Sequence, residues 1–247
     1  PADASEAEPQ PNATRTVLRF LTDSDYPPFN YLDEEGTLTG FNVDVARAVC
    51  LELDVTCDIK AFAWQDLLPT LGRGEVDAVI ASHAINSRTL AEADFTNRYY
   101  FTPARFASLK TAKPLEITPI GLEGVKIGVA ARSAHEAYLN QFFRDSLITV
   151  LPTLADAQAA LAAGQIDLLF QDGTQLVFWI NGSAAGGCCE LRGGAFFDDR
   201  YFGDGVGIAV RKNNLELKAQ LNKALAAIQS SGRFEELLLR YFPTRVY

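Results

Sequence analysis

Residues 67–82 read LLPTLGRGEVDAVIAS, and residues 157–172 read AQAALAAGQIDLLFQD. Each stretch passes from a helical pattern through a glycine to an aspartate, Asp77 or Asp167, and then into a short apolar run. A unit that recurs in this way indicates two copies of one structural element. The repeat therefore predicts two similar α/β lobes. The alternative is a chance similarity between two helix–strand units.

Short apolar runs alternate with helical patterns on both sides of these stretches. The predicted strands are Val17–Thr22, Thr56–Ala61, Ala78–Ala81, Lys126–Ala130, Thr149–Leu151, Leu168–Gln171 and Gly207–Val210. The predicted helices are Asn42–Leu53, Trp64–Arg73, Arg88–Ala91, His135–Phe143, Leu154–Ala163, Gly173–Ile180, Leu215–Ser230 and Arg233–Tyr241. Strands that alternate with helices form βαβ units, so we expect an α/β fold with mainly parallel sheets.

The composition excludes several classes of partner. The 247 residues carry a formal net charge of -9, and the sequence pI is near 4.8. An acidic chain suits neither nucleic acid nor an anionic membrane surface. No apolar run approaches the roughly 18 residues of a membrane span. The sequence begins at Pro1 and contains no Met, which we expect of a chain that has lost a signal peptide or has been trimmed. Residues 1–15, rich in Pro, Ala and Glu, predict a disordered leader.

The repeat also predicts where a ligand would bind. Ser82 and Asp172 follow equivalent strands of the two predicted lobes. In parallel α/β sheets, ligands lie beyond the carboxyl ends of the strands. If the lobes face each other, both side chains point into one cleft, a common place for a ligand site.

The segment Thr22–Tyr31 (TDSDYPPFNY) follows the first strand and lies at the same rim. Asp23 offers a charge there, and Tyr26 offers an aromatic wall. Trp64 begins the next predicted helix and suits stacking on a ligand. The alternative for these aromatic side chains is packing into the core, which we favour for Phe29 and leave open for Tyr26 and Trp64.

Ala81–Arg88 (ASHAINSR) leaves a buried strand and enters a helix. Backbone N–H groups at such a point favour an anion, and Arg88 adds a bidentate partner for a carboxylate. The alternative is that Arg88 pairs on the surface with Asp94 or Glu92.

Ala130–Glu136 (AARSAHE) is the counterpart in the second predicted lobe. Ser133 and the backbone around it suit a second anion, and Arg132 either contributes or is solvated. Asp172 across the cleft accepts hydrogen bonds only, so it suits an ammonium group. Opposed anion and cation sites of this kind suit a zwitterion of the α-amino-acid type.

The sequence contains no persuasive catalytic or metal-binding set. It has no GxSxG elbow, no P-loop and no dinucleotide fingerprint. His83 and His135 stand far apart, without zinc spacing and without a neighbour that would make either a convincing base. We therefore expect neither enzyme activity nor a cofactor, and core or surface roles for the histidines.

The four cysteines form two close pairs in the sequence. Cys50 lies late in a predicted helix and Cys57 on the strand after it, within reach of a disulfide; buried free thiols are the alternative. Cys188 and Cys189 are adjacent, and a vicinal disulfide and two reduced thiols remain equal alternatives. A disulfide implies an oxidising compartment.

Taken together, the segments resemble bacterial periplasmic solute-binding proteins of the polar amino acid class, which serve ABC importers. The matching stretches follow the family order over nearly all of the chain after residue 15. They are YPPF (26–29), GFNVDVARAV (40–49), LLPTLGRGEVDAVIAS (67–82), DFTNRYY (94–100), LEGVKIGVAARS (122–133), ALAAGQIDLLFQD (160–172), GVGIAVRKNNLELKAQLNKAL (205–225) and GRFEELLLRYF (232–242).

The resemblance implies the type II periplasmic binding protein architecture, in which a two-strand hinge joins two similar lobes. Lobe one would comprise residues 16–103 and 207–247, and lobe two residues 104–206. Cys50 and Cys57 match a disulfide found in some members of the family. A monomer is the expected state.

The resemblance also implies roles for residues of lobe one. Tyr26 and Trp64 would sandwich the apolar part of the ligand. Asp23 lies where some members contact a cationic side chain.

The charged groups of an amino acid would be bound from both lobes. Ser82 and Arg88 would bind the carboxylate with help from Ser133, and Asp172 would bind the amino group.

Three departures from the family pattern concern the carboxylate site. The run Ala84–Arg88 is one residue shorter than usual and lacks the usual hydroxyl residue and Thr. Arg132 and Ser133 replace a usual Gly-Thr, and His83 replaces a usually apolar residue. These departures place Arg132 and His83 among the candidate ligand-binding residues, and they make a ligand that is larger or has more than one carboxylate a plausible alternative.

The expected function is therefore capture of a small, carboxylate-bearing, amino-acid-like ligand in the cleft and delivery to an ABC transporter permease. One alternative is a binding protein for a larger polycarboxylated metabolite. A second is an enzyme like the cyclohexadienyl dehydratases, which are built on the same scaffold. A third is a detached sensor or partner-binding module, because similar lobes occur in receptor ectodomains.

Overall fold

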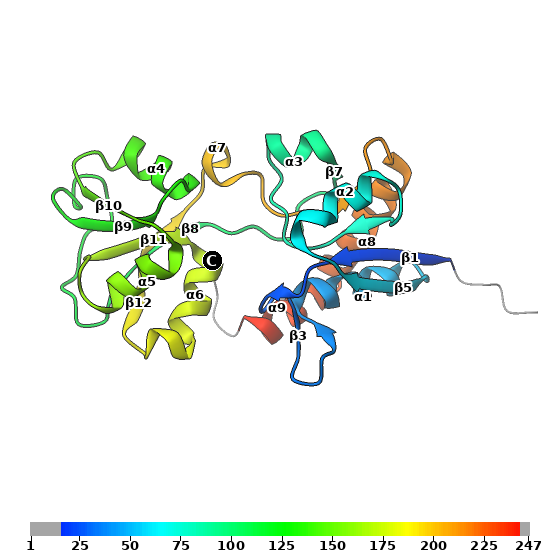
Figure 1. Cartoon of the computed structure of the whole chain (residues 1–247), viewed down its shortest axis with the longest axis horizontal. Helices are drawn as coiled ribbons and strands as arrows, with labels where there is room; N and C mark the ends of the chain where they lie inside the picture. The colour runs from blue at the N-terminus through cyan, green and yellow to red at the C-terminus, as the bar shows by residue number, and fades with distance from the viewer. Residues whose placement is uncertain (1–15, 243–247) are drawn as a thin grey trace, which may run out of the picture.

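Two lobes lie side by side along the long axis of the molecule in the computed structural model, which describes residues 16–242 (Figure 1). The predicted leader, residues 1–15, lies outside the described residues. Each lobe is built around a five-stranded sheet with helices on its faces. The two-lobed α/β fold predicted from the repeat is confirmed.

The sheet of lobe one has the strand order β5-β1-β6-β13-β7. These strands are β5 (Thr56–Ala61), β1 (Val17–Thr22), β6 (Ala78–Val79), β13 (Ala209–Val210) and β7 (Asp94–Phe95). The helices of this lobe are α1 (Phe41–Glu52), η1 (Trp64–Asp66), α2 (Leu67–Gly72), α3 (Ser87–Glu92), α8 (Leu215–Ser230) and α9 (Arg233–Tyr241). A small antiparallel sheet, β2-β3-β4, follows β1 and comprises Asp25–Tyr26, Asn30–Leu32 and Leu38–Thr39.

The sheet of lobe two has the equivalent order β10-β9-β11-β8-β12. These strands are β10 (Leu147–Leu151), β9 (Lys126–Ala130), β11 (Leu168–Asp172), β8 (Ala104–Leu109) and β12 (Cys189–Phe196). The helices of this lobe are α4 (Ala134–Phe142), α5 (Leu154–Ala162), α6 (Gly173–Asn181), η2 (Ser183–Ala185) and α7 (Asp199–Phe202). In both sheets, three parallel strands are followed by a fourth strand that runs antiparallel to both of its neighbours.

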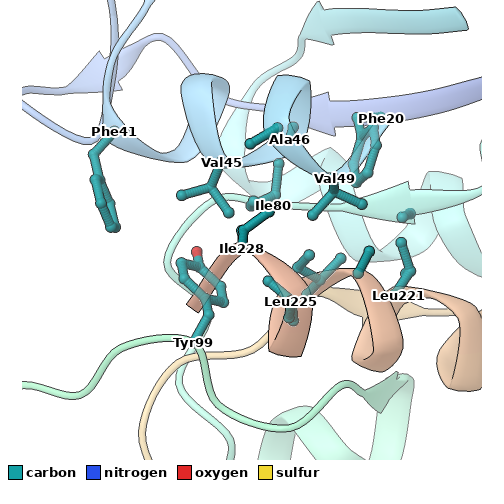
Figure 2. Packing of buried hydrophobic residues seen from close by; sticks show 14 of the residues in the cluster. Phe20, Phe41, Val45, Ala46, Val49, Ile80, Tyr99, Leu221, Leu225 and Ile228 are labelled. Atoms are coloured by element: carbon teal, nitrogen blue, oxygen red, sulfur yellow. The ribbon is translucent and has the colours of Figure 1, made fainter. Parts of the chain in front are cut away.

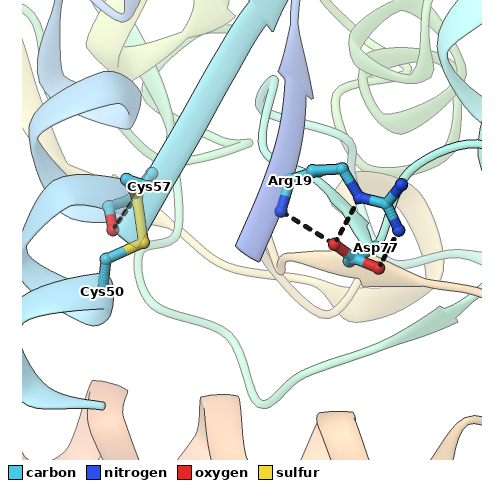
Figure 3. Close-up of a disulfide and its surroundings, with 5 residues drawn as sticks. Arg19, Cys50, Cys57 and Asp77 are labelled. Atoms are coloured by element: carbon cyan, nitrogen blue, oxygen red, sulfur yellow. Dashed lines mark hydrogen bonds and ion pairs between the residues drawn. A yellow bond between two sulfur atoms is a disulfide. The ribbon is translucent and has the colours of Figure 1, made fainter. Parts of the chain in front are cut away.

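The aspartate of each repeat joins the central strand of its sheet to the neighbouring parallel strand, β1 in lobe one and β9 in lobe two. The carboxylate of Asp77 accepts a hydrogen bond from the backbone N–H of Arg19 at 2.8 Å, and that of Asp167 accepts one from the backbone N–H of Lys126 at 2.9 Å. The backbone N–H of each aspartate donates in return to the carbonyl of the same residue, at 3.0 and 2.9 Å. The repeat in the sequence therefore reflects the same pair of hydrogen bonds between neighbouring strands in both lobes. In lobe one the Arg19 guanidinium adds two further bonds to Asp77 (Figure 3).

Two extended segments connect the lobes, one after β7 and one before β13 (Figure 1). They are hydrogen-bonded to each other, because the N–H of Tyr99 donates to the carbonyl of Val206 and the N–H of Val206 donates to the carbonyl of Tyr100, both at 2.9 Å. This pairing is the two-strand hinge that the family resemblance implied.

The core of lobe one is formed where α1 and α8 pack against each other and against the sheet (Figure 2). The apolar face of each helix repeats at helical spacing, so its buried side chains point the same way. The central members of this cluster are Phe20, Val45, Val49, Ile80, Leu221, Leu225 and Ile228, all at most 3% exposed.

Two disulfides are present. The bond between Cys50, late in α1, and Cys57 on β5 links the helix to the edge strand, as predicted (Figure 3). Cys188 and Cys189 also form a disulfide, at the start of β12. Over residues 16–242, no helix has the length and apolar character that crossing a membrane requires.

We expect Asp77→Ala and Asp167→Ala each to lower the free energy of unfolding by about 1–2 kcal/mol, because each removes the partner of a backbone N–H at a strand junction. Urea denaturation followed by circular dichroism measures this. Glu75→Ala is the matched control. The ion pair of Glu75 with Arg73 lies on the surface, and both side chains are more than half exposed, so its loss should cost less than about 0.5 kcal/mol. Equal costs for all three variants would contradict the assignment.

Candidate functional site

The carboxyl ends of β1 and β6 bring Asp23 and Ser82 to the face of lobe one that lies toward lobe two. Ser82 has a left-handed backbone, with φ 63°, so the chain turns sharply as it leaves the strand. Its hydroxyl oxygen accepts hydrogen bonds from the Tyr100 hydroxyl at 2.7 Å and from the Asn42 side-chain amide at 2.9 Å. Because both lone pairs are used, the hydroxyl hydrogen of Ser82 remains to be donated to an acceptor such as a ligand carboxylate.

Asn42, in the first turn of α1, is the centre of a buried polar network below Ser82. Its amide nitrogen also donates to the side-chain oxygen of Asn30 at 2.6 Å, and its oxygen accepts from the Tyr99 hydroxyl at 2.7 Å. Asn30 in turn donates to the carboxylate of Asp23. The network therefore connects the two candidate ligand-binding residues through fully buried amides.

Asp23 is 9% exposed and carries the buried charge of this wall. Burial raises the pKa of its carboxyl to about 6, with a smaller contribution from nearby Asp25, while a backbone hydrogen bond acts in the opposite direction. A carboxylate that is poorly solvated in this way gains from a cation placed beside it.

Tyr26 stacks on Phe29 with ring centroids 4.9 Å apart and planes within 11°. Phe29 is 2% exposed, which confirms its predicted core position. The hydroxyl of Tyr26 accepts a hydrogen bond of 2.9 Å from the side-chain amide of Gln175 on α6, so this contact spans the two lobes. Burial, chiefly, raises the pKa of Tyr26 to about 12.

Trp64, 49% exposed, lies flat against His83, with ring centroids 4.1 Å apart and planes within 8°. His83 is 5% exposed, and burial lowers its pKa to about 4. The two rings line a hollow of about 490 Å³ together with Ser82 and Arg88. His83 is therefore covered by Trp64 rather than presented openly to a ligand.

Arg88 lies in the first turn of α3 and is exposed. Asn86 caps this helix by accepting from the backbone N–H groups of Arg88 and Thr89. Within the part of the chain that the structure describes, Arg88 makes no ion pair, and Asp94 pairs with Lys212 instead. Among the described residues, neither surface pairing of Arg88, with Asp94 or with Glu92, is formed, and Arg88 lines the hollow.

Asp172 lies on the lobe-two side of the cleft, where it is the N-cap residue of α6. Its carboxylate accepts from the backbone N–H of Gln175 at 2.9 Å and is also hydrogen-bonded by the Thr102 side chain. Burial raises the pKa of this carboxyl, and these hydrogen bonds oppose the rise. The sequence predicted the position of Asp172 but not its second task of capping a helix.

Ser133 and Arg132 lie where β9 turns into α4. The hydroxyl of Ser133 donates to the carbonyl of Ala130 at 2.7 Å and accepts from the N–H of Glu136 at 3.0 Å, so its hydrogen is already used. Arg132 is exposed and has a left-handed backbone, with φ 56°, and its N–H donates to the Glu136 carboxylate. A ligand carboxylate would therefore gain less from the Ser133 hydroxyl than the sequence suggested.

Sequence reasoning missed a second part of the cleft, a hollow of about 290 Å³ that is lined from both lobes. Asp172 and His135 line it from lobe two, Ala84 from lobe one, and Arg200 from the short helix α7. His135 stacks on Phe202 with ring centroids 5.0 Å apart, and burial lowers its pKa to about 4. The segment FFDDRYF, residues 196–202, contains a capping aspartate followed by aromatic side chains, a pattern that indicates a short helix.

Comparison with known proteins gives a consistent result. The sequence profile of the bacterial extracellular solute-binding proteins, family 3, matches residues 18–244. The chain is 33% identical to the L-arginine-binding protein of Pseudomonas aeruginosa, over 93% of this chain and 89% of that protein. It is 31% identical to the lysine/arginine/ornithine-binding periplasmic protein of Escherichia coli, over 94% and 89%.

A solved structure shares the fold. It is the L-cystine solute receptor of Neisseria gonorrhoeae in the unliganded open conformation, with a TM-score of 0.81. The two chains are 20% identical, and the match covers 94% of each.

We expect Asn42→Ala to lower the free energy of unfolding by about 3 kcal/mol, because it leaves Ser82, Asn30 and Tyr99 without their buried partner. Tyr99→Phe is the matched control, since it removes only one of these hydrogen bonds and should cost about 1 kcal/mol. Urea denaturation of both variants provides the comparison. Similar costs for the two would show that the network does not depend on the Asn42 amide.

Proposed function

The chain belongs to the bacterial extracellular solute-binding proteins of family 3, and from this we propose that its ligand is an α-amino acid with a cationic side chain. The protein acts in the periplasm, where it captures an amino-acid-like ligand and delivers it to an ABC importer. What remains to be assigned is the class of amino acid and the residues that select it.

The observation that carries the proposal is the buried carboxyl of Asp23. It lies at the carboxyl end of β1, is 9% exposed, and in the described part of the structure faces no cationic side chain. A guanidinium or ammonium group beside it would recover the solvation that burial removes. Two relatives are named for arginine and for lysine, arginine and ornithine, ligands that carry such a group.

The remaining charges of such a ligand have matching groups. Arg88 would bind the α-carboxylate, and the free hydroxyl hydrogen of Ser82 would add a hydrogen bond. Asp172 would bind the α-ammonium group from lobe two. Because these contacts come from both lobes, the ligand would favour the closed arrangement over the open one.

The apolar stem of the ligand would lie between two aromatic side chains. One face of Tyr26 stacks on Phe29, and one face of Trp64 stacks on His83. The other face of each ring would contact the ligand. Aromatic faces also attract a delocalised cation, which suits a guanidinium.

We also propose that the ligand leaves the cleft chemically unchanged and that the protein is a monomer. The relatives named above are binding proteins. Turnover would be detected directly by mixing the protein with prephenate and recording phenylpyruvate absorbance. If the protein forms phenylpyruvate faster than its Arg88→Ala variant does, the protein is a dehydratase and the binding proposal is wrong.

The first test is a thermal-shift screen. The protein is first unfolded and refolded so that it is free of bound ligand. Arginine, lysine, ornithine and histidine form one group, glutamine and glutamate a second, and citrate and tricarballylate a third. At about 100 times its Kd, the ligand stabilises the fold by about 2.7 kcal/mol, a clear rise in Tm.

Asp23→Asn is the matched variant for this screen, because it removes the charge and keeps the size. It should lose the response to arginine while keeping any weaker response to glutamine. A response only to the polycarboxylates would overturn the proposal and favour a cleft in which Arg88 and Arg132 each bind a carboxylate.

The second test is the pH dependence of arginine affinity. A carboxyl whose pKa is raised to about 6 is protonated in the empty protein below that pH, and arginine must then displace the proton. Affinity should therefore fall as pH falls, by about tenfold between pH 7 and pH 5 for this group alone. Asp172, whose pKa is also raised, contributes with the same sign.

Isothermal titration at pH 7 and pH 5 measures this change, and Asp23→Asn separates the two carboxyls. The variant should bind arginine weakly at both pH values. Its affinity should lack the roughly tenfold fall from pH 7 to pH 5 that Asp23 contributes. An undiminished dependence in the variant would assign it to Asp172 or to the ligand.

A further inference from the structure

The stacked pair of Trp64 and His83 is the least expected feature of lobe one. Trp64 begins η1, whereas His83 follows Ser82 after β6, so the contact joins two separate elements. With centroids 4.1 Å apart and planes within 8°, the imidazole covers one face of the indole. The exposed half of the Trp64 side chain then leaves its other face open.

Trp64 lies beside the residues to which we assign the ligand carboxylate. Trp64, Ser82 and Arg88 line the same hollow. The position of the indole therefore decides how much room the ligand has beside Arg88.

The chain on either side of Trp64 gives the indole little support. Its neighbours in the sequence, from Phe62 to Asp66, are exposed. Over residues 16–242, His83 is the only ring that Trp64 contacts. An indole on an exposed 3₁₀ turn without this support would sample several rotamers.

A histidine at this position lowers the stability of the fold. The Nδ1 atom of His83 is buried and has no hydrogen-bond partner among residues 16–242, and such an atom destabilises a protein. Leucine would avoid this cost, but a branched side chain offers no flat surface for stacking. Imidazole offers one, and because burial lowers its pKa to about 4, it is uncharged at neutral pH and does not repel Arg88.

We propose that His83 is a positioning residue, which holds Trp64 flat on the wall of lobe one so that the free face of the indole is set for the ligand before binding. This role rests on the proposed function in so far as Trp64 contacts the ligand. The ligand then does not bear the cost of ordering the indole.

The experiment measures the motion of Trp64 separately from binding. Trp179→Phe leaves Trp64 as the one tryptophan, since the chain has two. In this background we compare His83, His83→Ala, His83→Leu and His83→Phe. Time-resolved fluorescence anisotropy of the ligand-free proteins reports indole motion on the nanosecond scale. If Trp179→Phe perturbs lobe two, the Trp64→Phe protein supplies the Trp179 signal for subtraction instead.

We expect His83→Ala and His83→Leu to add a fast anisotropy component and His83→Phe to suppress it. Arginine affinity, measured by isothermal titration, should fall about threefold to tenfold in the Ala and Leu variants, which is about 0.7–1.4 kcal/mol, and return to within about twofold in the Phe variant.

Two results would overturn the proposal. One is an indole that is equally immobile in all four proteins. The other is complete rescue of both measurements by leucine, which would reduce His83 to filling space. If the parent protein binds none of the amino acids, the proposed function fails while the anisotropy series still tests the contact between His83 and Trp64.

Discussion

The hydrogen bonds of the buried Asn42 side-chain amide hold together the part of lobe one that carries Asp23 and Ser82. It joins the first turn of α1 to Asn30 on β3, to Ser82 after β6 and to Tyr99 in a hinge segment. Since buried polar groups must be paired, and a partly paired network is costly, these parts have one arrangement in which every bond is made. That arrangement sets the left-handed turn at Ser82 and brings Asp23 into the same wall.

The same logic connects the ligand wall to the hinge. Ile85, in the loop before Arg88, exchanges backbone hydrogen bonds with the other hinge segment: its N–H donates to the carbonyl of Gly205 at 2.8 Å, and its carbonyl accepts from the N–H of Asp204 at 3.0 Å. The loop that carries Arg88 and the segments that join the lobes therefore form one hydrogen-bonded unit. Lobe closure would move the Asp172 side of the cleft toward a wall of lobe one that is already built.

Much of the fold followed from local sequence patterns. The strands Val17–Thr22, Thr56–Ala61 and Lys126–Ala130 and the last two helices have the predicted bounds. Within residues 16–242, six strands were missed. Four of them, β2, β3, β4 and β7, have only two or three residues each. The two longer ones have weaker signals: β8 (ARFASL) places a charge within an apolar run, and β12 (CELRGGAF) contains two adjacent glycines. Both are strands because they pair with neighbours far away in the sequence, β8 with β11 and β12 with β8.

The sequence by itself determined the two-lobed α/β organisation, the Cys50–Cys57 disulfide and the strand ends at which Ser82 and Asp172 lie, because periodicity, capping and a repeated Asp–strand unit act over short distances. Only the tertiary structure decided what each candidate side chain faces. It placed His83 under Trp64, gave the Ser133 hydroxyl an internal partner and brought His135 and Arg200 into the cleft. These outcomes depend on contacts between elements far apart in the chain, where burial and competition for hydrogen bonds, rather than residue type, determine which group remains for a ligand.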